Sequence, residues 1–453
     1  MDRFLFRCTR WFLLALLGLS LFFSGVGSAQ AGNGLTLALY PYVPRLDQFT
    51  TTIQAAWSAA HPDIPLTIIA DGNVWDGGYS MDPPDDVDVF VFDATFLAYF
   101  QSKNNLSSLS ASEVNNADDF LPFAIDGVKQ SDNTYAAIPL LGCTNVLFYW
   151  NTDTGIAQAS TLNDLDQVLH ECTYTSDIPP DIRGLMVKGS ASSNSYRYSE
   201  LYYAQYGTLP SLSGTALDPT VVANGNTLLS MGSYLNSNYK SSDSYIMSTW
   251  FSKRYGEAMV GYTESLSAMT QSMRDSVAMK LLPMGNKGYR PTFYADVIGI
   301  NSTTQGRGTR NAAVALANLL ASTDVVVDSI KATSSAPAQY LMPTRPSAFT
   351  ALKNNDTLYQ AIDQMVTSTN PVLFALDENV RTWMDTMKTT VNHAFWSGYP
   401  CGCDVDATGI FNYAQAQSTC PSLCTNQGGW SGQWTNTIPG HSSVCGCNTC
   451  PLP

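Results

Sequence analysis

The chain has 453 residues, of which 45% are hydrophobic and only 13% charged, and its acidic residues outnumber the basic ones by 37 to 23. The formal net charge of −14 and the lack of a basic run argue against nucleic acid or an anionic membrane as a partner. The length of the chain suggests two or three domains.

The N-terminus has the pattern of an export signal. Three arginines flank the apolar stretch WFLLALLGLSLFF, and small residues with an Ala-Gln-Ala site ending at Ala31 follow. This pattern predicts a signal peptide over residues 1–31, because its apolar core is too short to span a membrane. We therefore expect a secreted, extracellular protein without a membrane anchor after cleavage.

From residue 35 to about 400, short apolar runs alternate with amphipathic stretches. The apolar runs predict strands at 35–40, 66–70, 88–92, 145–150, 185–189, 258–264, 279–285 and 293–300. The amphipathic stretches predict helices at 47–61, 161–171, 310–322, 357–368 and 376–394. Alternating strands and helices predict an α/β protein with largely parallel sheets. Because the strands are too many for one ordinary sheet, we expect two lobes with a cleft between them.

Cys143 lies in the segment 137–150, where a small turn at 142–145 interrupts an otherwise apolar run. Such a cysteine is most often core filler, but it could also be half of a disulfide or a nucleophile. Removal of the leader leaves nine cysteines, so at least one is unpaired. Cys172, at the end of a predicted helix, could pair with the C-terminal segment, which leaves Cys143 as the best candidate for a free thiol.

Tyrosines and carboxylates recur where the predicted strands end, which is where ligands bind in open α/β sheets. Several are two residues apart and so share one face of an extended chain; they are Tyr40 with Tyr42, Asp93, Tyr262 with Glu264, and Tyr294 with Asp296. Singly, such residues are usually solvated caps. Together they predict a pocket for a flat, cationic ligand that offers hydrogen bonds. The histidines are not near strand ends, so Glu264 is the remaining candidate base for a cysteine nucleophile.

Residues 401–453 differ from the rest of the chain in composition. They carry seven of the ten cysteines, many glycines and serines, and little apolar periodicity. We expect a segment without a core of its own that disulfides hold together, four bridges in all if Cys172 takes part. Export makes a zinc site the less favoured interpretation of this spacing, and we predict no metal.

Five segments together resemble thiaminase I, in that family's order: LALYPYVPRLDQF, VFVFDATFL, IPLLGCTNVLFY, GYTESLS and FYADVIGIN. The resemblance covers roughly residues 35–400 and is most specific at the cysteine segment with Tyr-x-Glu about 120 residues later. It implies the two-lobed type II fold of periplasmic solute-binding proteins, with 341–349 near the hinge. The implied lobes are 32–142 with 291–345, and 143–290 with 346–400. The extension 401–453 departs from the bacterial pattern of the family.

The same resemblance implies a transferase, thiamine pyridinylase, that cleaves thiamine at its methylene bridge and passes the pyrimidine to an amine or thiol. Cys143 would attack the pyrimidine, Glu264 would activate the thiol, and Asp93 and Asp296 would hold the aminopyrimidine. The residues expected to line the cleft are Tyr40, Tyr42, Tyr245, Tyr262 and Tyr294. We expect a monomer that needs no cofactor.

Two alternatives stay open. A non-catalytic thiamine or sugar receptor on the same fold would need the tyrosines and acids but neither Cys143 nor Glu264. A secreted cysteine hydrolase is weakened by the missing histidine.

Overall fold

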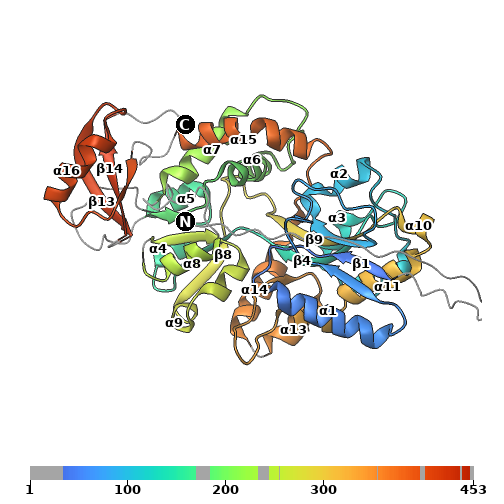
Figure 1. The fold of residues 1–453 in the computed structure, drawn as a ribbon. Helices are drawn as coiled ribbons and strands as arrows, with labels where there is room; N and C mark the ends of the chain where they lie inside the picture. The colour runs from blue at the N-terminus through green and yellow to red at the C-terminus, as the bar shows by residue number, and fades with distance from the viewer. Residues whose placement is uncertain are drawn as a thin grey trace, which may run out of the picture.

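The computed structural model describes residues 34–169, 184–232, 244–254, 256–354, 356–397, 404–438 and 441–448. The predicted signal peptide and Cys172 lie outside these residues. Two α/β lobes lie side by side, and a small third unit at the C-terminal end stands beside one of them (Figure 1).

One lobe is built on a seven-stranded sheet in the order β10-β4-β9-β3-β1-β2, with β11 paired to β9. The strands are β1 Leu35–Ala38, β2 Leu66–Ile69, β3 Val89–Asp93, β4 Ile138–Cys143, β9 Thr292–Ile300, β10 Met342–Pro343 and β11 Val372–Leu373. β1 runs parallel to β2 and β3, but β9 runs antiparallel to both β3 and β4.

The other lobe is built on a four-stranded sheet in the order β6-β7-β5-β8. Its strands are β5 Val146–Trp150, β6 Leu185–Met186, β7 Ala258–Gly261 and β8 Val277–Leu281. β5 is antiparallel to both of its neighbours. The expectation of largely parallel sheets was therefore wrong. β4 leads directly into β5 of the other sheet and β9 returns from β8, so no helical crossover within one sheet forces these strands to be parallel.

Helices cover the seven-stranded sheet on both faces. The helices of this half are α1 Leu46–Ala60, α2 Leu97–Ser102, α3 Pro122–Val128, α10 Thr304–Arg307, α11 Arg310–Leu320, α12 Thr323–Ile330, α13 Pro346–Lys353 and α14 Thr357–Thr369. α11 packs on β3, β4 and β9, and α3 packs on β4 and β11. Asp47 lies in the first turn of α1, whose N-cap is Arg45.

The helices of the other half are α4 Thr154–Gln158, α5 Leu162–Val168, α6 Ala191–Tyr206, α7 Pro219–Ser230, α8 Ser244–Phe251, α9 Gln271–Arg274 and α15 Val380–Trp396. Four short 3₁₀-helices complete the described part of the two lobes: η1 Ala94–Phe96, η2 Ala111–Glu113, η3 Ala117–Asp119 and η5 Thr263–Ala268. α15 packs on α6 and α7 and also contacts η1, which follows β3 of the other sheet.

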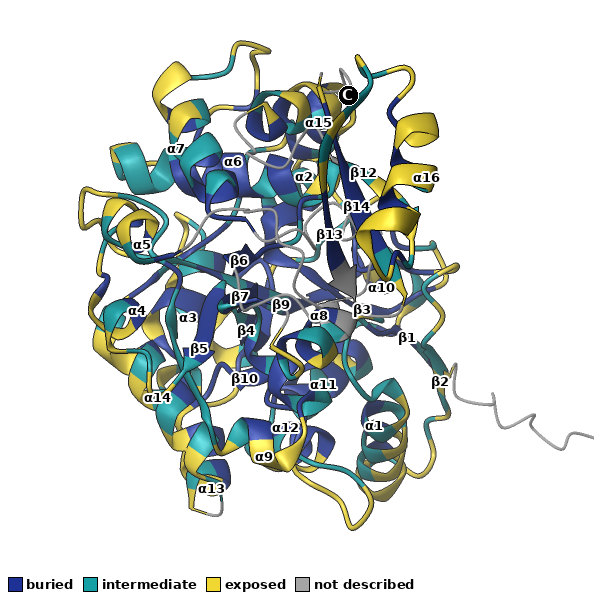
Figure 2. Cartoon of the chain, turned by 90° about the vertical axis from the view of Figure 1, so that its left-hand side faces the viewer, coloured by how far each residue is buried: buried dark blue, intermediate teal, exposed yellow. Residues whose placement is uncertain are grey.

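The strands lie at the centre of the core. Every residue of β3 is buried, which explains why VFVFD reads as a continuous apolar run rather than an alternating one. Phe90 and Phe92 are among its largest fully buried side chains, each worth about 1.5–3 kcal/mol of burial free energy. Figure 2 shows the buried strands in dark blue, with exposed residues on the outer faces of helices such as α1.

Among the described helices, none is by itself both long and apolar enough to cross a membrane. α11 and α12, bent by 55° at the break between them, meet that criterion only when they are counted as a pair.

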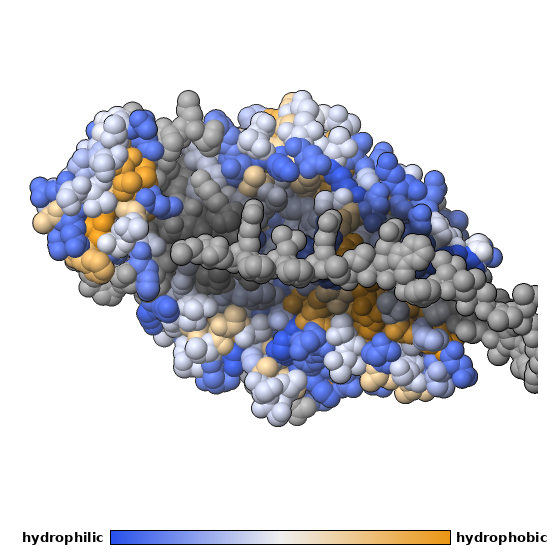
Figure 3. All heavy atoms as spheres, viewed as in Figure 1, coloured by the Kyte–Doolittle hydropathy of each residue, from blue (hydrophilic) through white to orange (hydrophobic). Residues whose placement is uncertain are grey.

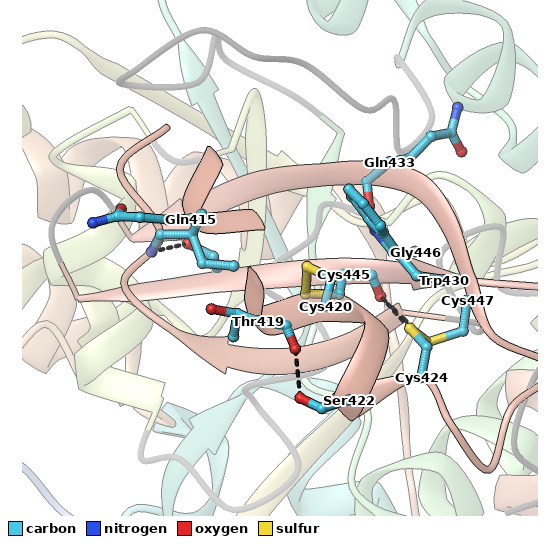
Figure 4. Close-up of a disulfide and its surroundings, with 12 residues drawn as sticks. Gln415, Thr419, Cys420, Ser422, Cys424, Trp430, Gln433, Cys445, Gly446 and Cys447 are labelled. Atoms are coloured by element: carbon cyan, nitrogen blue, oxygen red, sulfur yellow. Dashed lines mark hydrogen bonds between the residues drawn. A yellow bond between two sulfur atoms is a disulfide. The ribbon is translucent and has the colours of Figure 1, made fainter. Parts of the chain in front are cut away.

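The C-terminal unit consists of one helix on a three-stranded antiparallel sheet. Its elements are β12 Asp404–Thr408, α16 Tyr413–Leu423, β13 Trp430–Ile438 and β14 Ser442–Cys447. Two disulfides join α16 and its C-cap residue to β14: Cys420 to Cys445, and Cys424 to Cys447 (Figure 4). Cysteines four apart share a helix face and cysteines two apart share a strand face, so the spacing suits two bridges side by side.

The expectation that this segment has no core of its own was wrong. Both disulfides are buried together with Ile410, Ala416 and Trp434 in a cluster separate from the main core. The bridges replace apolar volume that a unit of this size lacks, which is why apolar periodicity alone did not reveal it.

Candidate functional site

The candidate site begins at the ends of three adjacent strands. Cys143, the last residue of β4, is paired in register with Tyr294 on β9. Asp296 on β9 is paired with Asp93, the last residue of β3. Directly opposed residues, and residues two apart on one strand, point to the same face of a sheet. The strand register therefore places one thiol, one tyrosine and two carboxyl groups on a single face.

Tyrosine rings surround the carboxyl group of Asp93. The Tyr79 hydroxyl donates to Asp93 Oδ2 over 3.1 Å and lies 3.1 Å from the Tyr40 hydroxyl. The ring of Tyr42, more than half exposed, has its centroid 5.5 Å from that of Tyr40 and 5.8 Å from that of Tyr79. Tyr40 and Tyr42 follow β1 as predicted, whereas Tyr79 lies in a loop and was missed by reasoning from strand ends.

The loop that carries Tyr79 turns through two glycines. Gly77 has φ 77°, and a Cβ atom there would lie 2.5 Å from Cδ2 of Tyr40. The Gly77 carbonyl also accepts from the backbone N–H of Asp93 at 3.1 Å. Only glycine lets this turn form with the Tyr40 ring against it.

Burial raises the pKa of Asp93, even though its carboxylate accepts hydrogen bonds from the Thr95 backbone (2.8 Å) and from Tyr79. Burial also raises the pKa of Asp296 well above its usual value, and the nearby charges of Asp93 and Glu264 raise it further. These carboxyl groups therefore hold protons more tightly than free aspartates do.

Tyr262 and Glu264 come from the other lobe. β7 ends at Gly261, and η5 carries Glu264 toward the thiol, where its charge contributes to the raised pKa of Cys143. Burial raises the pKa of Glu264 itself to about 7. Cys143 and Glu264 also act on the pKa of Tyr262, which burial raises well above its usual value. The site is therefore assembled from both sheets.

Cys143 is a free, half-buried thiol. Burial raises its pKa well above the usual value, and four carboxyl groups raise it further: Glu264, Asp296, Asp93 and Glu200. Such a thiol stays protonated until a base accepts its proton or a cation enters the site.

Glu200 on α6 also belongs to this cluster. It is 4% exposed, and burial raises its pKa to about 7. The Asn145 side-chain amide donates to Glu200 Oε1, and the Tyr294 hydroxyl donates to the same carboxyl group. Sequence reasoning missed this residue because α6 was not predicted and its sequence, ASSNSYRYSELYYAQY, has no clear apolar periodicity.

Tyr245 is the predicted residue that the structure joins least directly to this cluster. It lies half-buried on α8, which packs against η5 and β7, so it is near the segment that carries Glu264. In the part of the chain that the structure describes, no group of three or more His, Cys, Asp or Glu residues is arranged to hold a metal ion.

Comparisons with known proteins identify the family. The sequence model of the Thiaminase-1 domain matches residues 144–285. The curated Thiaminase-1 of Paenibacillus thiaminolyticus is 31% identical over 396 residues, which is 84% of this chain and 94% of that relative. Clostridium botulinum thiaminase I, solved in complex with thiamin, has a TM-score of 0.72 at 29% identity and covers 80% of this chain and 99% of its own.

More distant matches share the fold or the C-terminal unit. Maltose-bound MalE3 of T. maritima has a TM-score of 0.57 at 17% identity, with 81% of this chain and 95% of that chain covered, so it supports the fold alone. The sequence model of Mannan-binding protein matches residues 414–447. The match to the curated relative covers most of the chain and therefore identifies the family. The chain belongs to the thiaminase I family of transferases and has the two-lobed α/β fold of periplasmic-binding proteins.

Proposed function

We propose that the protein cleaves thiamine at its methylene bridge through a covalent intermediate on Cys143 and transfers the pyrimidine to an amine or thiol. The observation that carries this proposal is the placement of a free thiol opposite Tyr294 and among acidic side chains from both lobes. A receptor needs no such thiol. The two C-terminal disulfides fit an enzyme that acts outside the cell. We propose that it acts as a monomer.

The electrostatics of the site suit a cationic substrate. Buried carboxyl groups with raised pKa values hold protons until a positive charge favours their ionised forms. Thiamine carries a permanent positive charge on its thiazolium ring. Its entry would lower the pKa of Cys143 as well, so that the thiolate forms only when the substrate is bound.

Asp93 and Asp296 would hold the aminopyrimidine, since they are paired on one face beside the edge-to-face rings of Tyr40 and Tyr42. Carboxylates accept from the exocyclic amine and from a protonated ring nitrogen. Stabilising that proton makes the ring more electrophilic. Tyr40, Tyr42 and Tyr294 supply aromatic faces for the flat ring and its charge.

The proposed reaction begins at the thiol. Glu264 accepts the thiol proton of Cys143, and the thiolate forms a sulfur–carbon bond to the pyrimidine ring. The displaced ring electrons break the methylene–nitrogen bond, and the thiazolium nitrogen keeps that electron pair and leaves as neutral thiazole. An amine or thiol then bonds to the methylene carbon, the sulfur–carbon bond breaks, and Cys143 regains the proton from Glu264 while the nucleophile's own proton goes to water.

The test incubates the purified protein with thiamine and aniline and detects the pyrimidine–aniline adduct by mass spectrometry. Cys143→Ser should bind thiamine with similar affinity in calorimetry but lose nearly all turnover, because the two side chains are close in size. Turnover of the serine variant within a few-fold of wild type would refute the covalent mechanism. Thiamine that binds without being consumed by the wild type would favour the receptor alternative.

We further propose that the C-terminal unit binds mannose-containing glycans. The match of residues 414–447 to Mannan-binding protein favours this second function. Phe411 and Tyr413 are each more than half exposed, and the Tyr413 ring lies 5.9 Å from that of Trp430. Exposed aromatic faces beside polar groups suit sugar rings. Figure 3 shows apolar side chains on the surface of this unit, at the left of the view.

Retention on immobilised mannan tests this second function, with galactan as the polysaccharide control. Trp430→Ala and Tyr413→Ala should lose retention at least tenfold, whereas Leu423→Ala, which removes another exposed apolar side chain of α16, should not. Equal retention on both polysaccharides, or no effect of the aromatic substitutions, would contradict the proposal. Thiamine turnover should not change in any of these variants.

A further inference from the structure

Glu200 has contacts that no step of the proposed reaction uses. Its carboxyl group is buried on α6, among helices of the four-stranded lobe, yet both of its hydrogen-bond donors lie beyond that helix. One donor is the hydroxyl of Tyr294 on β9 of the seven-stranded sheet. The other is the amide of Asn145, which lies between β4 and β5 where the chain passes from one sheet to the other.

These two donors flank the thiol. Tyr294 is the register partner of Cys143, and Asn145 follows Cys143 by two residues. The carbonyl of Asn145 also accepts from Leu282 (3.0 Å), immediately after β8. One buried carboxyl group therefore holds both sides of the segment that presents the nucleophile.

The surroundings of Glu200 keep its position well defined. Arg197, one helical turn earlier on α6, is also buried, and its guanidinium donates to the Lys188 carbonyl (2.9 Å) and to Asn194 Oδ1 (2.7 Å). The positive charge of Arg197 favours the ionised form of Glu200 and so opposes the effect of burial. Tyr262 and Cys143 also lie within electrostatic reach of Glu200.

We propose that Glu200 is a positioning residue that joins the two lobes at the active site, holding Tyr294 and the Cys143–Asn145 segment against α6. It does not touch the reacting atoms. It fixes the thiol relative to the pyrimidine ring of thiamine, against which Tyr294 would pack. Its negative charge discourages ionisation of Cys143 while no cationic substrate is present. This role rests on the proposed function of Cys143, but the contacts themselves do not.

Two measurements on Glu200→Gln separate this role from simple stabilisation of the fold. The first is kcat and KM for thiamine with aniline, where a misplaced thiol should lower kcat about 10- to 100-fold with a smaller change in KM. The second is the rate at which iodoacetamide alkylates Cys143 in the absence of thiamine. That rate should rise several-fold at pH 8, because removing a neighbouring negative charge lowers the pKa of the thiol.

Tyr294→Phe and the double variant complete a mutant cycle. If Glu200 acts by holding the hydroxyl of Tyr294, the double variant should lose little more kcat than the more damaging single variant. Glu113→Gln is the matched control, since Glu113 is an acid paired with Arg310 on the seven-stranded lobe, away from the site. It should change neither kcat nor the alkylation rate.

Independent losses that multiply in the double variant would overturn the link to Tyr294. Unchanged alkylation together with kcat within twofold of wild type in Glu200→Gln would overturn the proposal as a whole. If the wild type fails to turn over thiamine, the alkylation rates still decide whether Glu200 controls the thiol, so failure of the proposed function and failure of this inference are distinguishable.

Discussion

Four carboxyl groups and one thiol share this site, where burial raises the pKa of each group and nearby negative charges raise those of Asp296 and Cys143 further. Glu264 and Glu200 have pKa values raised to about 7, whereas the pKa of Cys143 is raised well above its ordinary value. A base that titrates near neutral pH can accept a proton and return it in the same cycle. Glu264 is a better candidate for this base than Glu200, because the carboxyl group of Glu200 is already hydrogen-bonded to Tyr294 and Asn145.

Glu264→Gln should lower kcat about 10²- to 10⁴-fold, the usual effect of removing an acid–base group, with a smaller effect on thiamine affinity. In the wild type, kcat/KM should rise as pH increases through about 7, because only the ionised carboxylate accepts a proton. The variant should lose that rise. Asp275→Asn, an exposed acid in the same region of sequence, is the control. A loss confined to affinity would make Glu264 a substrate contact.

The sequence predicted the residues that end strands and missed those that do not. Tyr40, Asp93 and Asp296 could be found because the alternation of a strand places them at a known edge. Tyr79 follows a Gly-Gly turn in a loop, where no periodicity fixes the direction of a side chain. Glu200 belongs to the site only through its tertiary contacts with Asn145 and Tyr294, which have no local signal in the sequence of α6.

At the scale of elements, the strands were easier to predict than the helices. Each apolar run from LTLALY to FYADVIGI contains a strand, within a few residues. The helix α6 was missed because Ser, Asn and Tyr dominate it and its buried face carries polar residues such as Asn194 and Glu200. A helix that buries polar groups loses the apolar stripe by which helices are recognised.

The turn at Gly77 gives a prediction for one loop. Gly77→Ala should weaken thiamine binding at least tenfold, because the new Cβ would displace the Tyr40 ring as well as strain a backbone with positive φ. Gly288→Ala separates the two effects. Gly288 also has positive φ, 68°, but a Cβ atom there meets nothing within 4 Å.

The control should lose about 1 kcal/mol of unfolding free energy and keep its thiamine affinity. Calorimetric titration with thiamine and urea unfolding measure the two quantities. Equal affinities for the two alanine variants would mean that the position of Tyr40 does not matter for binding.

At the scale of the whole molecule, the two-lobed fold was predicted while the direction of its strands was not. A count of strands suggested two sheets, but the double passage of the chain between them, at Asn145 and again before β9, makes β9 antiparallel to β3 and β4. That passage also explains the site. It brings Cys143 to the boundary between the lobes, where groups from the four-stranded side can reach it.

Collecting buried acids at this boundary costs the folded protein stability, and the cost depends on pH. A folded-state pKa of about 7 against an ordinary value of 4.5 corresponds to about 3 kcal/mol for Glu200. Because the folded-state pKa is the higher one, the folded state binds the proton more tightly. Stability is then greatest below about pH 4.5 for this group and is lost as pH rises through about 7.

The free energy of unfolding, measured by urea titration at pH 5 and pH 8, should therefore fall more with pH in the wild type than in Glu200→Gln or Glu264→Gln. The contribution of Glu113 to stability changes with pH in the opposite direction. Its hydrogen bonds with Arg310 lower its pKa to about 2, so Glu113 stabilises the fold above about pH 4.5 and loses that effect in acid. Glu113→Gln should consequently leave the difference between pH 5 and pH 8 unchanged while lowering stability at both. A Glu200→Gln protein whose stability falls as steeply as the wild type between these two pH values would show that this carboxyl group does not titrate there, and that its burial is offset by Arg197 and its two hydrogen-bond donors.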